Sequence, residues 1–238
     1  MTDPMTRLDK VMVGWAALGT LFWVAFAIGT GQIIAFAIYY PLWLGVAGVV
    51  GWRRRAALAA RIRAMRLTGA ARFIVLGYAA VLSEEVLAGL ANHLPEGFSP
   101  VLLPVRVLQF QALNLFAFFG FVVGWYLLTR YVVFTRREVF YLAGVWGLYA
   151  EKIIFALPTQ PAFVFLTAGP TILTYALIIA PALIGQDMGR ARIRLHPLLR
   201  YPLAYLVLQV LSLPAVLAVL GLRAQLPWLF PPPGMVPP

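Results

Sequence analysis

The sequence has no cysteine and only two histidines, His93 and His196, in 238 residues. Without cysteine, the chain has no disulfide bond, thiolate metal ligand or cysteine nucleophile. Two histidines are too few for a metal site built from several of them, so we expect no metal centre. For the same reason we expect no haem or chlorophyll held by several histidines. The sequence does not identify a cofactor.

Charged residues are also scarce. They make up 11% of the chain, whereas a soluble domain has about 25%. Hydrophobic residues make up 62%, and several apolar runs approach the length of about 20 residues that crosses a bilayer. Lipid offers the backbone no hydrogen-bond partners, so spanning segments of this kind are helical. We therefore expect an all-α integral membrane protein whose residues 1–238 form one transmembrane domain.

Negative charge is rarer than positive charge: 8 acidic residues stand against 19 lysines and arginines, for a formal net charge of +11. A basic balance can indicate nucleic-acid binding. Here the positive residues lie beside apolar segments, in loops at residues 52–70, 135–137 and 186–201. That arrangement is typical of cytoplasmic loops of membrane proteins. We expect membrane lipids as partners and no nucleic acid.

Seven apolar segments predict a seven-transmembrane-helix bundle. The run before the first basic loop is too long for one span, and Gly29-Thr30-Gly31-Gln32 offers a reversal within it. Two helices or one long tilted helix with partial re-entry both fit this run. With the basic loops on one side, the N-terminus is cytoplasmic and the C-terminus outside, in a plasma (cytoplasmic or inner) membrane. The expected spans are residues 11–28, 33–51, 71–93, 101–134, 139–157, 162–184 and 202–222.

The first basic loop contains arginines that alternate with alanine and leucine. One interpretation is an amphipathic helix in the membrane interface that binds anionic lipids or a partner. The other is a plain cytoplasmic loop, and the sequence does not separate the two. The arginines of this candidate lipid or partner surface are Arg53, Arg54, Arg55, Arg61, Arg63 and Arg66.

Glu84 and Glu85 lie side by side near the middle of the third expected span. A charge at membrane depth is unfavourable, so such residues face a bundle interior, a cavity or a partner. Helix rise places several polar groups about 8–13 Å below the outer ends of three spans. We expect them to form one buried cluster with ion pairs between helices. Its members are Glu84, Glu85, Arg106, Gln109, Glu151 and Lys152.

Three acids and two bases leave this cluster with an excess carboxylate. At low dielectric an unpaired carboxylate tends to take up a proton, so the balance predicts one neutral glutamic acid or a bound cation. Residues 73–84 also align without gaps on residues 140–151, with matching phenylalanine, glycine and glutamate. A parallel repeat of this kind would put Glu84 and Glu151 in equivalent places.

The segment Glu84-Glu85-Val86-Leu87-Ala88-Gly89 resembles the first motif of the CAAX-processing glutamic intramembrane proteases, a glutamate pair followed by arginine. Gly89 occupies the arginine position, and the later histidine-bearing motifs have no match. Seven spans with an inside N-terminus and a glutamate in the third are similar to heliorhodopsins. Those proteins hold retinal on a lysine of the seventh span, and residues 202–222 contain none. We assign no family.

Three functions fit the polar cluster. In the first, the cluster is an ion-pair network that fixes helix packing or attaches another subunit. In the second, it binds or transfers protons or cations. In the third, it catalyses a reaction. In the catalytic case one glutamate acts as general base and Arg106 stabilises an oxyanion; the candidates for the base are Glu84, Glu85 and Glu151. The sequence favours a non-catalytic subunit or assembly factor of a larger membrane complex, with other membrane subunits as partners. The alternative is a membrane-embedded enzyme or a proton- or cation-coupled carrier of a lipid-like substrate.

Overall fold

A computed structural model of the chain describes residues 5–96, 98–186, 188 and 191–226. Regular structure in these ranges is helical, apart from one isolated bridge between Val132 and Ile193. Short π and 3-10 segments occupy Pro41–Gly48, Leu94–Glu96 and Ile153–Ala156. The α-helices are α1 Arg7–Thr30, α2 Ala35–Tyr40, α3 Val49–Arg53, α4 Arg55–Ala64, α5 Gly69–His93, α6 Leu102–Ala117, α7 Phe119–Tyr131, α8 Arg136–Ala150, α9 Pro161–Gly185 and α10 Pro197–Gln225.

Six helical stretches of the described chain are long and apolar enough to cross a membrane, which makes this a multi-pass membrane protein. The expected span at residues 139–157 differs, because α8 ends at Ala150 after 15 residues. Lys152 then takes a left-handed conformation, which stops the helix. The six stretches are Arg7–Thr30, Ala35–Arg53, Gly69–His93, Leu103–Tyr131, Pro161–Ile184 and Pro197–Leu222.

Two other apolar runs are divided in the structure. Gly31 caps α1 with a φ of 66°, a conformation that glycine adopts without steric penalty, and helix resumes at Ala35. The run at residues 11–51 therefore forms two helices. The expected continuous helix at 101–134 is broken at Phe118, whose φ and ψ of −84° and 1° separate α6 from α7. The Phe118 ring is buried against Phe121 and Tyr175 at this break.

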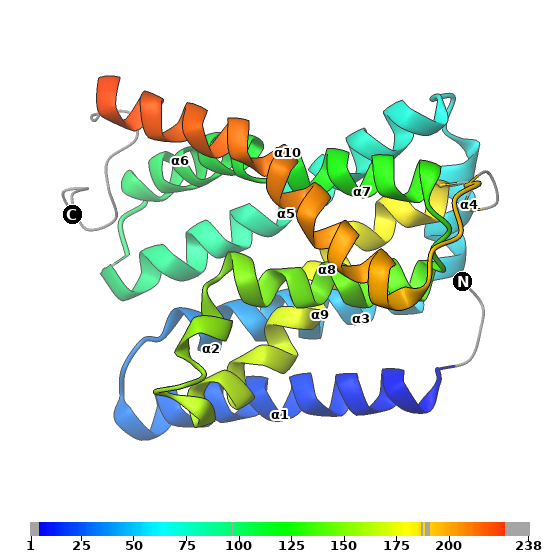
Figure 1. Ribbon diagram of the computed structural model, residues 1–238. Helices are drawn as coiled ribbons and strands as arrows, with labels where there is room; N and C mark the ends of the chain where they lie inside the picture. The colour runs from blue at the N-terminus through cyan, green and yellow to red at the C-terminus, as the bar shows by residue number, and fades with distance from the viewer. Residues whose placement is uncertain (1–4, 97, 187, 189–190, 227–238) are drawn as a thin grey trace.

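The arginine-rich segments gather at one end of the molecule, which we call the basic end. It comprises the start of α1, helix α4, the α7–α8 connection and the described part of the α9–α10 connection, whereas α10 ends at the opposite end (Figure 1). Arg137 pairs with Asp9 at 3.0 Å, which joins α8 to α1. The Val133 amide donates to the Ile193 carbonyl at 2.9 Å, which joins the two connections.

The segment between the second and third apolar runs forms helix α4 at the basic end. Ala59 and Ile62 are buried, while most of its arginines are exposed. Arg55 instead stacks on Trp52 at 4.2 Å and donates to the Trp52 carbonyl. Residues Arg55–Ala64 of this segment are helical, and the binding of lipid or a partner to it stays a prediction. The exposed arginines are Arg53, Arg54, Arg61, Arg63 and Arg66.

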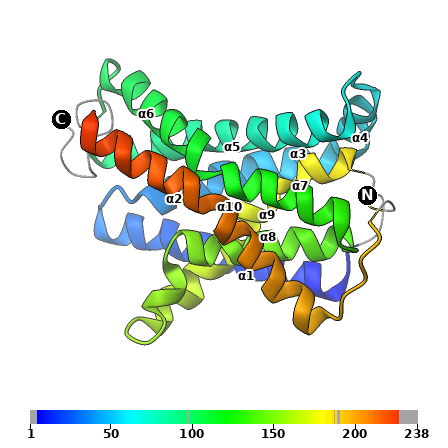
Figure 2. The same cartoon turned by 45° about the horizontal axis from the view of Figure 1, so that its top comes forward.

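Helix α9 lies at the centre and packs against α1, α5 and α8. Its buried side chains include Ile178 and Ile179, which are fully excluded from solvent. Glycines let neighbouring helices approach closely, as is common in membrane bundles. A Cβ atom on Gly144 would collide with the Ile172 carbonyl of α9, and one on Gly120 of α7 with the Ser212 backbone of α10. In Figure 2 the turn between α8 and α9 projects from this body.

Candidate functional site

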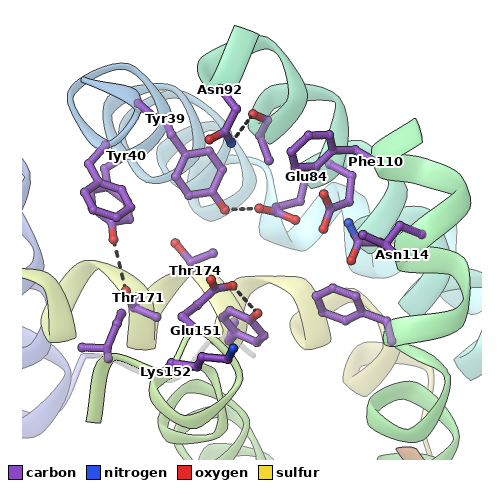
Figure 3. Close-up of a pocket in the computed structure, with 18 of the residues that line it drawn as sticks. Tyr39, Tyr40, Glu84, Asn92, Phe110, Asn114, Glu151, Lys152, Thr171 and Thr174 are labelled. Atoms are coloured by element: carbon purple, nitrogen blue, oxygen red, sulfur yellow. Dashed lines mark hydrogen bonds between the residues drawn. The ribbon is translucent and has the colours of Figure 1, made fainter. Parts of the chain in front are cut away.

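A cavity of about 400 Å³ lies between α2, α5, α6, α9 and the end of α8 (Figure 3). It is in the half of the bundle remote from the basic end, since its tyrosines come soon after α2 begins and its glutamates late in α5 and α8. Eleven of the lining residues are polar: Tyr39, Tyr40, Glu84, Glu85, Asn92, Asn114, Glu151, Lys152, Thr171, Thr174 and Tyr175. The apolar ones are Ala35, Phe36, Ala88, Phe110, Leu113, Phe118, Ile153 and Phe163.

The first acidic wall of the cavity belongs to α5. Glu84 and Glu85 are each 6% exposed, and both line the cavity although they are neighbours on a helix. The Tyr39 hydroxyl of α2 donates to Glu84 Oε1, as Figure 3 shows. Glu85 follows Glu84 directly on α5, and Asn114 of α6 lines the same cavity. Helix α5 thus holds two carboxyl groups together in the bundle interior.

The second acidic wall is the end of α8. Glu151 caps this helix, and its carboxylate accepts a hydrogen bond of 2.6 Å from the Tyr175 hydroxyl of α9. The Tyr175 ring lies against Gly147, where a Cβ atom would meet it at less than contact distance, so the glycine permits this placement. Lys152 has a φ of 59° and is the one non-glycine residue with positive φ in the described chain. Both Glu151 and Lys152 are exposed.

Two threonines of α9 complete the lining. The Tyr40 and Thr171 hydroxyls form a hydrogen bond of 3.1 Å. Thr174 is only 3% exposed, and its hydroxyl has no hydrogen-bond partner among the described residues. Directly after Tyr40 the second span becomes π-helical, a form that is frequent at functional sites. The Thr174 hydroxyl is thus a buried polar group on the cavity wall without a partner.

A second, smaller cavity of about 180 Å³ adjoins the first. The two share Asn114, Phe118, Glu151 and Tyr175 in their linings. The rings of Phe118 and Tyr175 stack at 5.8 Å between centroids. The smaller cavity extends from there toward Trp146. The break between α6 and α7 at Phe118 therefore shapes the boundary between the two spaces.

The structure brings four of the six residues of the expected polar cluster to the cavity: Glu84, Glu85, Glu151 and Lys152. Arg106 is buried on α6 and Gln109 is half-buried, but neither lines it. The arrangement with Arg106 as an oxyanion partner is therefore not assembled around this cavity. The arginines of the lipid or partner surface lie at the basic end, away from the site.

In the described chain, the contacts shown for Glu84 and Glu151 are hydrogen bonds from tyrosines, and the expected ion pairs with arginine and lysine stay a prediction. Sequence reasoning missed Tyr39, Tyr40, Tyr175 and the two threonines as site residues. A signal was present: Tyr39 and Tyr40 lie too deep in their span for the interface. Comparison of the chain with protein-family models, curated proteins and solved structures finds no match.

Proposed function

We propose a seven-span topology with a cytoplasmic N-terminus and the C-terminus outside, in a plasma (inner) membrane. Helix α8 and the turn after it supply the crossing that the six long stretches lack. In Figure 1 α8 runs away from the basic end and α9 returns to it. The gathering of arginine-rich segments at one end supports a cytoplasmic placement of that end.

We infer that the protein is a carrier that moves a small solute across the membrane together with protons or a cation. The observation that carries this proposal is the cavity into which α5 and α8 bring three carboxyl groups. Acids at membrane depth mark ion and proton pathways, and a cavity of this volume is in the range of small-molecule sites. The enzymatic alternative has less support, because Arg106 is not at the cavity.

The position of Glu84 and Glu85 favours proton coupling. They are adjacent and buried, and they line the same cavity. Two neighbouring carboxyl groups in a low-dielectric interior are not both ionised at low cost, so one of them tends to hold a proton. Displacement of this proton by a solute would link solute binding to proton release. The other titratable side chains that face the pair in the cavity are Tyr39 and Tyr40 of α2, Glu151 and Lys152 of α8, and Tyr175 of α9.

Electrical recordings from reconstituted protein test the carrier proposal. Full-length chain in liposomes on a solid-supported membrane is challenged with a panel of small amines, carboxylic acids, sugars and amino acids. We expect at least one class to evoke a current that Glu84→Gln and Glu151→Gln abolish and that Lys10→Gln, at an exposed position, retains. No current from any class, with stable co-purification of other membrane subunits, would contradict the carrier proposal and favour a non-catalytic subunit or assembly factor.

We also propose that the basic end contacts anionic lipid headgroups. Helix α4 packs its apolar side on the protein and exposes its arginines, and juxtamembrane arginines attract anionic lipid. The double variant Arg61→Gln with Arg63→Gln is expected to purify with less phosphatidylglycerol than the unchanged chain. Unchanged lipid content, measured by mass spectrometry of extracted lipid, would contradict this contact.

A further inference from the structure

We infer that the cavity binds an organic cation, a protonated amine with an apolar body. This inference rests on the proposed carrier function and names its substrate class. Three acids and one lysine line the cavity. Even with a proton on one of the three acids, two negative charges remain against one positive charge, so the lining has a net negative charge. A cationic ligand would neutralise it.

The rest of the lining suits the apolar part of such a ligand. Seven aromatic rings surround the acids: Phe36, Tyr39, Tyr40, Phe110, Phe118, Phe163 and Tyr175. Ammonium groups are attracted to the faces of aromatic rings, and this attraction strengthens when water is excluded. An inorganic cation has no apolar part to pack against the ring faces that line the cavity. An amine with an apolar body can pair its charge with the acids and pack its apolar part against the rings.

The placement of the acids also favours an extended ligand over a metal ion. Glu84 of α5 and Glu151 of α8 come from different walls of the cavity (Figure 3). In the described residues no group of three histidine, cysteine, aspartate or glutamate side chains is close enough to hold a metal ion. Tyr39 and Tyr175 each donate to the Oε1 atom of one glutamate, and an ionised carboxylate has a second oxygen for an N–H donor.

The Thr174 hydroxyl is an independent sign of a ligand. It lies on the cavity wall, is 3% exposed and has no hydrogen-bond partner among the described residues. Buried polar groups in folded proteins almost always have a partner, and an unpaired one is destabilising. A polar group of the ligand, or a water molecule that the ligand orders, would supply the hydrogen-bond partner of this hydroxyl.

Binding of 2-phenylethylamine to the purified full-length chain tests the inference, with its neutral analogue 2-phenylethanol as the matched probe. We expect the amine to bind at least about tenfold more tightly, because its ammonium group forms hydrogen bonds with the carboxylates in which both partners are charged, whereas the hydroxyl of the alcohol is neutral. Glu151→Gln, at an exposed position where folding is not at risk, should weaken amine binding tenfold or more. Thr174→Val should weaken it a few-fold, Lys152→Gln should tighten it, and Lys10→Gln, at an exposed position of α1, should leave it unchanged.

Equal affinity for the amine and the alcohol, or amine binding that Glu151→Gln and Glu84→Gln leave unchanged, would overturn the inference. Retention of thermal stability shows that each variant is folded. The two proposals fail separately. Amine binding without a solute-driven current would contradict the carrier function and still support an organic cation as the ligand. A proton-linked current evoked only by another solute class, with no amine binding, would overturn the ligand class and keep the carrier.

Discussion

The two acidic walls of the cavity use the same contact in different surroundings. Glu84 is buried in the middle of α5, whereas Glu151 is exposed at the end of α8, yet each accepts a hydrogen bond from a tyrosine of a neighbouring helix. In the first wall the helix continues past the acid and packing determines its position. In the second a helix end determines it. The comparison therefore contrasts a buried α5 wall with a more accessible α8 wall.

The two segments aligned in the sequence, residues 73–84 and 140–151, also occupy similar structural positions as far as their matched glutamates. Gly77 contacts Val122 of α7, and Gly144 contacts Ile172 of α9, so the matched glycines both lie at close helix contacts. The matched glutamates both line the cavity. The likeness stops there, because α5 continues to His93 and α8 ends at Ala150. Common origin of the two segments stays a prediction.

The largest expected effect on stability comes from adding a Cβ atom at the two glycines where α5 and α8 pack closely on neighbouring helices. Gly144→Ala should destabilise the protein by about 3 kcal/mol, because its Cβ would meet the Ile172 backbone, which cannot rotate away. Gly77→Ala should lower stability by about 1 kcal/mol, since its Cβ would meet Val122 Cγ1 at 2.8 Å and a side chain can yield. Unfolding in mixed detergent micelles measures both. Equal losses would mean that the two walls pack alike.

Removal of the tyrosine hydroxyls tests the difference in burial directly. Tyr39→Phe leaves a buried acceptor on Glu84 without its donor, so we expect a loss of about 1–3 kcal/mol. Tyr175→Phe should lower stability by less than about 1 kcal/mol, because water reaches the exposed Glu151. The same unfolding assay applies. A greater loss of stability for Tyr175→Phe than for Tyr39→Phe would contradict the inferred difference in burial between the two walls.

Lys152→Gly should stabilise the α8 wall. Lysine at a φ of 59° has a steric penalty of about 1 kcal/mol that glycine lacks. We expect a gain of that size in unfolding free energy. Lys152→Ala is the control, because it removes the same charge and keeps a Cβ atom in the left-handed conformation. A gain shared by both variants would assign the effect to charge and not to backbone geometry.

The smallest expected effect concerns the other end of α8. Burial opposes ionisation of Glu138, but hydrogen bonds from Thr135 and Tyr201 and the charge of Arg200 outweigh it and lower its pKa. A lowered pKa in the folded state contributes stability above the ordinary value of 4.5, which is lost as the pH falls below it. We expect Glu138→Gln to reduce this acid-dependent loss by less than about 1 kcal/mol. Identical pH profiles of stability would contradict the assignment.

The membrane class and several elements of the site followed from the sequence, for identifiable reasons. Apolar runs and arginine positions report directly on the bilayer, and adjacent glutamates at membrane depth indicate a sheltered site. The end of α8 did not follow, since a lysine in a left-handed conformation has no local signature. The depth estimate suggested Arg106 as a partner. Depth along a helix says nothing of the face on which a side chain lies, and Arg106 is not at the cavity.

The π-helical stretch after Tyr40 has a mechanical consequence. It accommodates more residues per turn than an α-helix, so a change from one form to the other rotates the preceding residues about the axis. Tyr39 and Tyr40 stand at this junction, with their hydroxyls on Glu84 and Thr171. A conversion between the two forms would therefore turn both phenol groups relative to their acceptors.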